Sequence, residues 1–206
     1  MPTPRRSQTE RSRSTRAALM TAARPLFAEQ GYAAVPADEI VRAAGVTRGA
    51  LYHHFGDKQG LFRAVIEQLE TEITEELRTV LRATEDPWSA AFGTLSRFLD
   101  LCLRPEVVRI ALTDAVSVLG WQEWRELESR YGLRLITEVL ETTAADGLLI
   151  EAPIPELAQL TLSACAEAAL MIAHAEDREA AKEKALAALV ALLSGLVKER
   201  NQSAGC

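Results

Sequence analysis

The helical spacing of apolar residues is the feature that most limits how this chain can fold. In residues 58–82 a leucine, valine or isoleucine stands at every fourth position from Leu61 to Leu81, which is the pattern of an amphipathic helix. Similar spacing recurs along the chain, and no segment alternates apolar and polar residues as a half-buried strand does. The sequence therefore predicts an all-α fold. The expected helices cover residues 13–30, 36–44, 48–55, 58–82, 87–103, 105–119, 121–145, 155–175 and 178–200.

Length and composition indicate a soluble cytoplasmic protein. With 206 residues, of which 48% are hydrophobic, the chain can bury a substantial core. Its basic start is not followed by the apolar run of a secretory signal, and its most apolar segment, residues 157–173, contains Gln159 and Glu167, which argues against a membrane span. The three cysteines stand far apart and fit free thiols in a reducing compartment. We therefore expect no membrane contact and no cofactor.

Charge is unevenly distributed. Residues 1–58 contain nine Lys or Arg and five Asp or Glu, whereas the rest of the chain contains 14 basic and 24 acidic residues. A basic end joined to an acidic body is typical of a module for binding a polyanion fused to a domain with another task. The overall net charge of −6 hides this asymmetry.

Residues 36–55 have the pattern of a helix-turn-helix. A short helix begins at Pro36 and ends before Gly45, and Thr47 can cap the next one. When the second helix of such a unit enters a major groove, its first turn reaches the base edges. Arg48 can then make a bidentate contact to guanine, and Ala50 can contact a thymine methyl group.

The other residues of this segment suit the DNA backbone. Gly49 has a cost in a helix of about 1 kcal/mol relative to alanine, which makes sense if a bulky partner approaches the backbone there. We expect sugar-phosphate contacts, which fix register without reading sequence, from Thr47, Tyr52, His54 and Lys58.

Two alternatives apply to the same segment. Helix-turn-helix patterns also occur in bundles that never meet DNA. The adjacent His53 and His54 could bind a metal or act as a base, but neighbouring side chains on a helix diverge by about 100°, and no second cluster with ligand spacing accompanies them. We therefore expect neither catalytic residues nor metal ligands.

Residues 15–69 contain AARPLFAEQGY followed by IVRAAGVTRGALYHHFGDKQGLF. This run resembles the N-terminal domain of the TetR/AcrR family of bacterial transcriptional regulators, in which the combination AGV(T/S)xGxLYxHFxxKxxL is specific. The resemblance implies a homodimer that binds operator DNA through three N-terminal helices. A long fourth helix would join them to a larger domain that binds a ligand and dimerises. The recognition-helix roles fall on Thr47, Arg48, Gly49, Ala50, Tyr52, His53, His54 and Lys58.

Two positions depart from the family pattern. Val35 and Pro36 stand where the family has a threonine or serine cap, and loss of a cap costs about 0.5–2 kcal/mol. Pro25 lies inside the first expected helix, where we expect a kink near residues 21–24. Both departures put DNA contacts from that face in doubt.

The chain is thus expected to divide into a disordered basic arm (1–12), a DNA-binding domain (13–58), a ligand-binding and dimerisation domain (59–200) joined through helix 58–82, and a disordered tail (201–206). The last two helices have broad apolar faces with small residues, which suits a four-helix dimer interface. A bundle within one chain is the alternative. The interface candidates are Leu160, Ala164, Ala168, Leu186, Leu189, Leu193 and Val197.

A ligand pocket is expected among the middle helices, where aromatic and polar residues gather. Single aromatic residues at helical spacing are more often core, but the set could line a mixed cavity. The candidates are Trp88, Phe92, Phe98, Cys102, Arg109, Asp114, Trp121, Trp124, Tyr131, Met171 and His174.

The sequence therefore predicts a ligand-responsive transcriptional regulator, a repressor, that binds palindromic operator DNA as a homodimer. A dimer reads two half-sites only if its recognition helices stand about 34–36 Å apart, so a small-molecule effector that moves helix 58–82 would release the DNA. Such coupling is commonly about 1–3 kcal/mol. The alternatives are a helical enzyme using His53 and His54 or the tryptophan-rich cavity, and a small-molecule carrier with a vestigial DNA-binding end.

Overall fold

The computed structural model describes residues 8–198, and in this range the fold is all-α, as the sequence predicted. The chain forms two compact units. The first extends to Thr71 and also contains Arg104–Arg125; the second contains Glu72–Leu103 and the chain from Glu126 onwards. Helix α4 (Lys58–Arg82) contributes its first half to one unit and its second half to the other.

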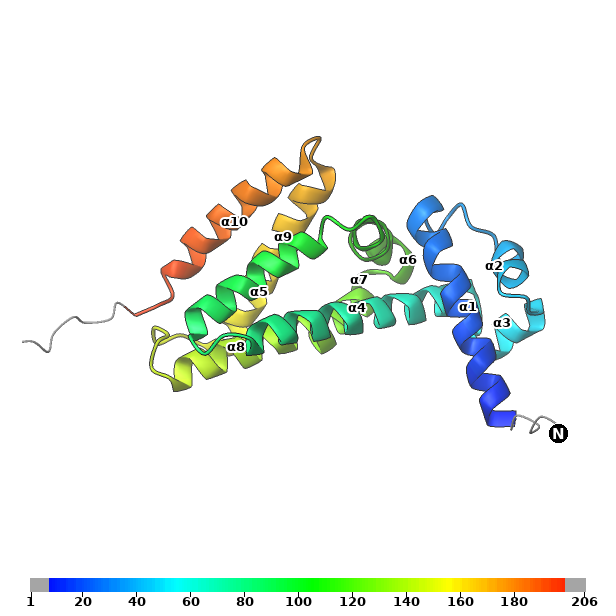
Figure 1. The fold of residues 1–206 in the computed structure, drawn as a ribbon, viewed down its shortest axis with the longest axis horizontal. Coiled ribbons are helices and arrows are strands. Elements are labelled where there is room, and N and C mark those ends of the chain that lie inside the picture. The colour runs from blue at the N-terminus through cyan, green and yellow to red at the C-terminus, as the bar shows by residue number, and fades with distance from the viewer. Residues whose placement is uncertain (1–7, 199–206) are drawn as a thin grey trace, which may run out of the picture. The chain divides into compact units, whose positions relative to one another are not determined.

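The first unit is built on α1 (Gln8–Gln30), α2 (Ala37–Ala43), α3 (Arg48–Phe55) and the start of α4. Helix α1 packs against both α2 and α3 (Figure 1). The core between them consists of fully buried apolar side chains, and the Phe27 and Phe62 rings meet edge to face with their centroids 5.1 Å apart. Other fully buried members are Leu19, Ala23, Val35, Ile40, Leu51 and Leu61.

The two short helices begin in different ways. Helix α3 is capped by Thr47, whose hydroxyl accepts a hydrogen bond from the Ala50 amide at 3.3 Å. Helix α2 has Pro36 at its cap position and no side-chain cap bond, which agrees with the departure noted in the sequence. Between them the turn passes through Gly45 at φ 65°, a conformation that favours glycine.

Helix α1 differs from its expected form. It begins at Gln8, so residues 8–12, expected to be part of a disordered arm, are helical. Residues 1–7 of that arm and the tail 201–206 lie outside the described residues. The helix runs without interruption through Pro25.

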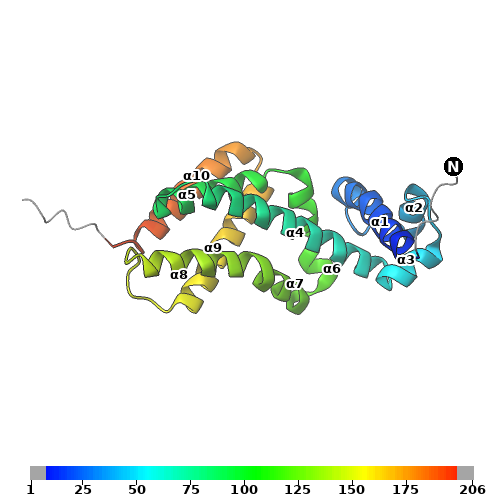
Figure 2. The ribbon, with the colours of Figure 1, turned by 60° about the horizontal axis from the view of Figure 1, so that its bottom comes forward.

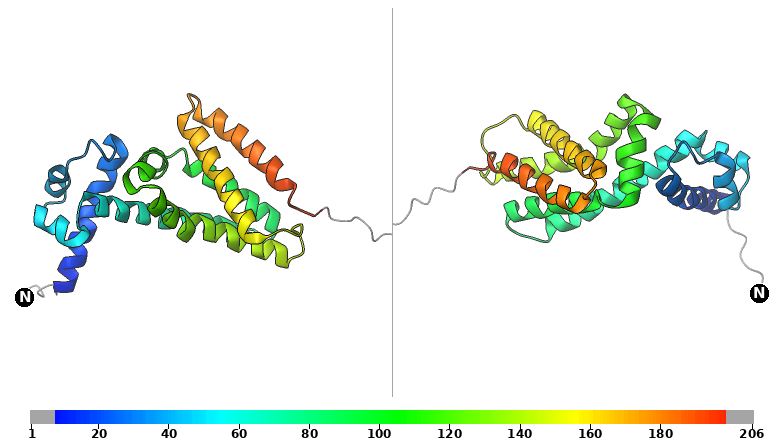
Figure 3. Two further views of the ribbon diagram at one scale, coloured as in Figure 1. Left: turned by 180° about the vertical axis from the view of Figure 1, so that it is seen from behind. Right: turned by 90° about the horizontal axis from the view of Figure 1, so that it is seen from above.

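The second unit contains α5 (Pro87–Leu101), α8 (Arg134–Ala145), α9 (Ile154–His174) and α10 (Arg178–Ser194). Helix α9 packs against α8 and α10, and α10 also packs against α5 (Figures 2 and 3). One apolar cluster joins α5, α9 and α10 through Leu99, Ala168, Ile172, Ala185 and Leu189. A second cluster joins α8 and α9 through Leu140, Leu149 and Ala158.

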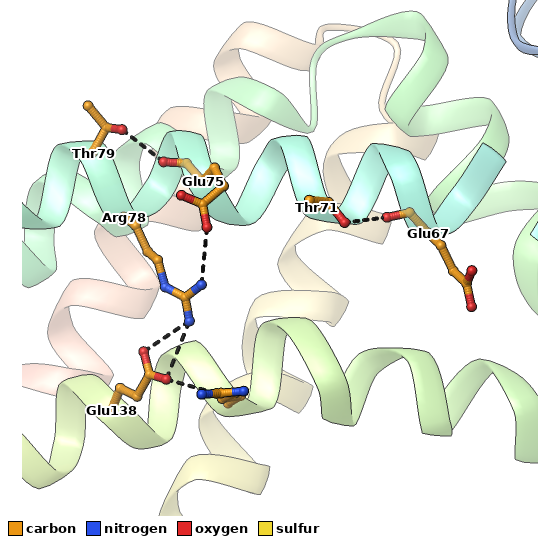
Figure 4. Close-up of polar contacts among 7 residues, drawn as sticks. Glu67, Thr71, Glu75, Arg78, Thr79 and Glu138 are labelled. Carbon is orange, nitrogen blue, oxygen red and sulfur yellow. Dashed lines mark hydrogen bonds and ion pairs between the residues drawn. The ribbon is translucent and has the colours of Figure 1, made fainter. Parts of the chain in front are cut away.

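A polar contact also joins α4 to α8 within the second unit (Figure 4). The Arg78 guanidinium donates to the Glu138 carboxylate at 3.1 Å, and Arg134 donates to the same carboxylate at 3.0 Å. The hydroxyls of Thr71 and Thr79 bond back to backbone carbonyls four residues earlier on α4. These side chains are partly exposed, so the network orients the helices more than it stabilises them.

Two expected helices are divided by π-helical turns, which are frequent at functional sites. Residues 105–119 form the π-helix η1 (Val107–Asp114) followed by α6 (Ala115–Leu119), and residues 121–145 form α7 (Trp121–Glu128), the π-helix η2 (Ser129–Leu133) and α8. In η1 the Thr113 hydroxyl reaches the Val108 carbonyl five residues back at 2.8 Å. Neither break was predicted from the apolar spacing.

Helix α10 ends at Ser194, earlier than the expected residue 200. After it, Val197 forms an antiparallel bridge with Leu149, and the Lys198 amide donates to the Leu148 carbonyl at 2.8 Å. By length and composition α9 is apolar enough to cross a membrane, but core helices often share these properties. Here α9 packs between α8 and α10.

Candidate nucleic-acid interface

Helix α3 has one buried and one exposed face. Leu51 is fully buried and anchors the helix in the first unit, whereas Thr47, Arg48, Gly49, Tyr52 and His53 are exposed. Ala50 and His54 are half-buried. The first turn of the helix, which the sequence predicted to read base edges, is therefore accessible.

Gly49 has no packing reason to be glycine. A Cβ atom placed there would lie 3.8 Å from the Thr47 hydroxyl oxygen, an ordinary van der Waals distance. The residue is also in ordinary helical conformation, since it has no positive φ. The absent side chain therefore leaves free space on the outer surface of the helix.

The Arg48 guanidinium lies between two acceptors. One terminal nitrogen donates to Asp38 at 3.2 Å and the other donates to the Tyr52 hydroxyl at 3.1 Å. The hydrogen bond with Tyr52 and then the charge of Asp38 raise the pKa of Arg48, whose guanidinium is cationic in any case, as arginine is in proteins. Asp38, in the first turn of α2, is a contact that the sequence reasoning missed.

Lys58 has a different environment from the one expected of a phosphate contact. Its ammonium donates to the backbone carbonyls of Tyr32 and Val35, each at 2.9 Å, and lies 4.0 Å from the centre of the Tyr32 ring. Burial lowers the pKa of this lysine. The loop between α1 and α2 is thus held by α4 through Lys58, and the phosphate contact expected of this lysine stays a prediction.

The two adjacent histidines contact each other, and the backbone of His54 also contacts α1. Their rings meet edge to face with centroids 5.0 Å apart. Arg16 of α1 donates to the His54 carbonyl at 3.4 Å, and its guanidinium lies 4.5 Å from the centre of the Phe55 ring. Among residues 8–198 no group of three or more His, Cys, Asp or Glu side chains could hold a metal ion.

The segment 104–125 contacts the end of α1 and the loop after it. The Tyr32 amide donates to the Asp114 carboxylate at 2.7 Å. Arg109 donates to the Gln30 carbonyl at 3.3 Å. Arg24 makes a two-pronged ion pair with Glu106, with distances of 2.9 and 3.0 Å. Arg109 and Asp114 were expected in a ligand pocket. In the structure their charged groups bond to the last residue of α1 and to the loop after it, and their place in a ligand pocket stays a prediction.

Two more polar contacts join this segment to α4. Gln59 donates to the Val118 carbonyl at 3.0 Å, and Arg63 pairs with Glu123. Beside them lies an open cavity of about 410 Å³ with both signs of charge in its lining, from Arg16 and Arg63 to Asp57 and Glu67. Because its lining is mainly polar, the cavity does not resemble the apolar pocket expected for an effector.

The remaining pocket candidates do not share one environment. Cys102 is buried, Phe98 packs against the cluster of α5, α9 and α10, and Trp124 and Tyr131 are half-buried. Trp88, Phe92, Trp121, Met171 and His174 are exposed. The candidates are also divided between the two units, since Trp121 and Trp124 belong to the first. A single pocket lined by the whole set stays a prediction.

Gln159 on α9 is a polar residue that the sequence reasoning did not assign to the pocket. Its side-chain Nε2 atom is buried and has no hydrogen-bond partner among the described residues. One turn further along the same helix, Leu162 faces the π-helix η2, since a Cβ on Gly132 would lie 3.1 Å from it. A buried amide nitrogen without an acceptor is costly, so this group would gain from a hydrogen-bond partner.

The interface candidates divide into two groups. Ala168 and Leu189 are buried between α9 and α10 of the same chain, whereas Val197 is half-buried and its backbone forms the bridge with Leu149. Leu160 is 68% exposed, and Ala164, Leu186 and Leu193 are half-buried. Met171 and Leu192, at 58% and 61% exposure, extend the apolar surface.

Comparison with known proteins gives a consistent result. Residues 19–65 match the family described as bacterial regulatory proteins, tetR family, and residues 88–196 match the tetracyclin repressor-like C-terminal domain. A solved TetR-family transcriptional regulator from Pectobacterium atrosepticum is 37% identical, with a TM-score of 0.84 over 94% of this chain and 99% of that one. The chain belongs to the TetR family.

Curated relatives match over shorter regions. The Transposon Tn10 TetC protein of Escherichia coli is 35% identical over 60% of this chain and 62% of its own length. The HTH-type transcriptional regulator AcrR of Shigella flexneri is 35% identical over 52% of this chain and 50% of its own length. The chain thus spans one half to three fifths of the length of these two relatives.

Proposed function

We propose that this protein is a ligand-responsive transcriptional repressor that binds palindromic operator DNA as a homodimer in the cytoplasm and releases it when a small-molecule effector binds. The observation that carries the proposal is the exposed first turn of α3. It places a capped helix N-terminus, a permanently cationic arginine and an unfilled glycine position on one accessible surface.

The chemistry of that turn suits a DNA groove. A helix N-terminus attracts phosphate because its first amides point outward, and a glycine without internal contacts lets a sugar-phosphate chain come close. Arg48 reads guanine through its two-pronged fork. Thr47 and His53, both exposed, are placed for backbone contacts.

An exposed apolar surface supports the homodimer. Leu160 and Met171 on α9 are largely exposed, and on α10 Leu192 stands among the exposed small residues Ala187 and Ala191. Small residues allow two helices to approach closely, and a patch of this kind on a soluble protein marks an interface. A second copy meets it about a two-fold axis, which matches a palindromic operator.

Two observations support regulation by an effector. The buried Gln159 amide needs an acceptor, so a ligand entering the second unit would bring a carbonyl, carboxylate or hydroxyl oxygen to it. The segment that contacts the end of α1 lies within residues 88–196, which match the C-terminal domain of the family. An effector that alters this segment would disturb the loop before α2 and lower the affinity for DNA.

Selection from a pool of random DNA duplexes tests the proposal. The purified protein should enrich one palindromic sequence, and its affinity for that sequence should fall steeply with salt because phosphate contacts release counterions. Arg48→Ala should lower the preference for one base pair in each half-site by about 1–3 kcal/mol. Enrichment of no sequence by the unmodified protein would refute specific operator binding.

The dimer has a separate test. Leu192→Asp places a charge on the exposed face of α10 without entering the core, so it should convert the dimer to a monomer in sedimentation and weaken operator binding. Lys184→Asp, at an exposed polar position of the same helix, is the matched control. Equal masses for both variants and the parent protein would argue against this interface.

A further inference from the structure

The contact between Asp38 and Arg48 joins the two helices of the helix-turn-helix across their exposed surface. The Asp38 carboxylate lies 3.2 and 3.5 Å from one terminal nitrogen of the guanidinium, and the Tyr52 hydroxyl lies 3.1 Å from the other. The Tyr52 ring also lies 5.6 Å from the centre of the guanidinium. Two side chains, Asp38 from α2 and Tyr52 from α3, therefore hold the Arg48 guanidinium.

This arrangement is not explained by stability. The side chains of Arg48 and Asp38 are 59% and 67% exposed, and Tyr52 is 44% exposed. An ion pair so open to water contributes little to folding. Its main physical effect is on conformation, because an arginine with many rotamers is held with its plane in one orientation.

The charge of Asp38 is also unfavourable for DNA binding in general. A carboxylate on the surface that carries the first turn of α3 repels phosphates, and it cancels part of the positive charge of Arg48. A surface built for affinity alone would have a neutral or basic residue there. The neighbouring Glu39 is different, since its carboxylate accepts a hydrogen bond from Gln30 of α1 at 3.2 Å and not from Arg48.

We propose that Asp38 is a positioning residue for base recognition: with Tyr52 it holds Arg48 so that the guanidinium meets guanine in one orientation, which lowers affinity for DNA at large and raises discrimination at one base pair of each half-site. This inference rests on the proposed function. It assigns Tyr52 to the orientation of Arg48, where the sequence had suggested a phosphate contact.

The test measures binding to three duplexes: the sequence enriched by the unmodified protein, the same sequence with the guanine pair read by Arg48 replaced, and a random duplex. Asp38→Asn keeps the shape and removes the charge. It should strengthen binding to the random duplex about twofold to fivefold, because one repulsive charge is gone. It should also reduce discrimination at the guanine pair about threefold to tenfold, because a neutral acceptor holds the guanidinium less strongly.

Two further variants separate charge from positioning. Glu39→Gln removes the same charge from the same helical turn and should strengthen binding to the random duplex without changing discrimination. Tyr52→Phe removes the hydroxyl and no charge, so it should reduce discrimination without strengthening binding to the random duplex. Circular dichroism should show that all variants fold, since the altered groups lie at or near the surface.

The decisive comparison repeats Asp38→Asn in an Arg48→Ala background. There the change should still strengthen binding to random DNA but should leave discrimination at the guanine pair unaltered. If Asp38→Asn changes binding to all three duplexes by one factor in both backgrounds, Asp38 acts only through its charge and the inference is wrong. If Arg48→Ala itself leaves discrimination intact, the base-reading part of the proposed function fails first.

Discussion

The helix-turn-helix and the pair α9–α10 are both helical, yet they are held together by different kinds of residue. The first relies on single residues with individual tasks: Thr47 caps α3, Gly45 forms the turn, and Lys58 binds two loop carbonyls. The second relies on many equivalent apolar contacts, such as those of Ala168, Ala185 and Leu189. A surface that reads DNA needs fixed backbone geometry, whereas a packed pair of helices needs only complementary apolar faces.

The core aromatic of the first unit gives the strongest test of this difference. Phe62→Ala should lower the free energy of unfolding by about 3–5 kcal/mol, because the ring is fully buried against Phe27 and Tyr32. Urea denaturation measures the loss. Phe92→Ala, at a position 39% exposed, is the control and should cost about 1 kcal/mol or less. Equal losses of unfolding free energy in the two variants would contradict the proposed difference between the two regions.

Lys58→Ala tests whether a single side chain holds the loop between α1 and α2. The variant leaves the Tyr32 and Val35 carbonyls without their donor, so the free energy of unfolding should fall by about 1–3 kcal/mol. The salt dependence of operator binding should keep its slope. A slope reduced by about one unit, with stability unchanged, would instead make Lys58 a phosphate contact. Lys184→Ala, on the exposed side of α10, is the matched control.

In the second unit, Gln159→Leu asks whether the buried amide has a structural or a ligand-binding task. Removing a polar group without a partner should raise the free energy of unfolding of the free protein by about 1–2 kcal/mol. An effector that bonds to the amide should bind the variant more weakly. Gln122→Leu, at an exposed glutamine of α7, should change neither quantity. A loss of stability in Gln159→Leu would show that the amide has a partner.

Gly49→Ala separates stability from recognition in the helix-turn-helix. Alanine favours a helix over glycine, and the site has room for a methyl group, so the free energy of unfolding should rise by about 0.5–1 kcal/mol. DNA affinity should fall, because the methyl group occupies the space left for the duplex backbone. Thermal unfolding and DNA titration measure the two effects, and unchanged DNA affinity would remove the reason given for the glycine.

The smallest predicted effect is a change in stability at acidic pH. The hydrogen bond from Arg134, followed by that from Arg78, lowers the pKa of Glu138 (Figure 4). A carboxyl whose pKa is lower in the folded state stabilises the fold above its unfolded pKa, and this contribution is lost as the pH falls through the folded value. Glu138→Gln should therefore be slightly less stable than the parent protein at neutral pH; the difference should shrink as the pH falls below the unfolded pKa of about 4.3 and vanish below the lower pKa of the folded state. Glu141→Gln, exposed on the same helix, serves as control.

The sequence was informative where single residues have distinct physical tasks. Helices α3 and α4 begin and end as predicted, because Thr47 caps the first and a regular apolar stripe defines the second. The all-α class followed from the same spacing. The cap loss at Pro36 was also predictable from the residue type alone.

The rest depended on contacts that no local pattern contains. The π-helical turns of η1 and η2 have ordinary helical sequences, and only packing decides their register. The bond from the Tyr32 amide to Asp114 and the contact of Asp38 with Arg48 join residues of different elements, so neither contact could be seen in the sequence. Charge and aromatic content suggested a pocket at Arg109 and Asp114, but the sequence could not show that the same side chains bond to the end of α1 and the loop after it.

The buried thiol of Cys165 can report how often the second unit opens. Burial raises the pKa of this cysteine on α9 to about 11, and only the thiolate attacks alkylating reagents. At neutral pH its modification must wait for the surrounding helices to separate, so the labelling rate, followed residue by residue with mass spectrometry, reports how often that happens. A compound that stabilises the packing of these helices would lower the labelling rate of Cys165 without any change in the protein's sequence.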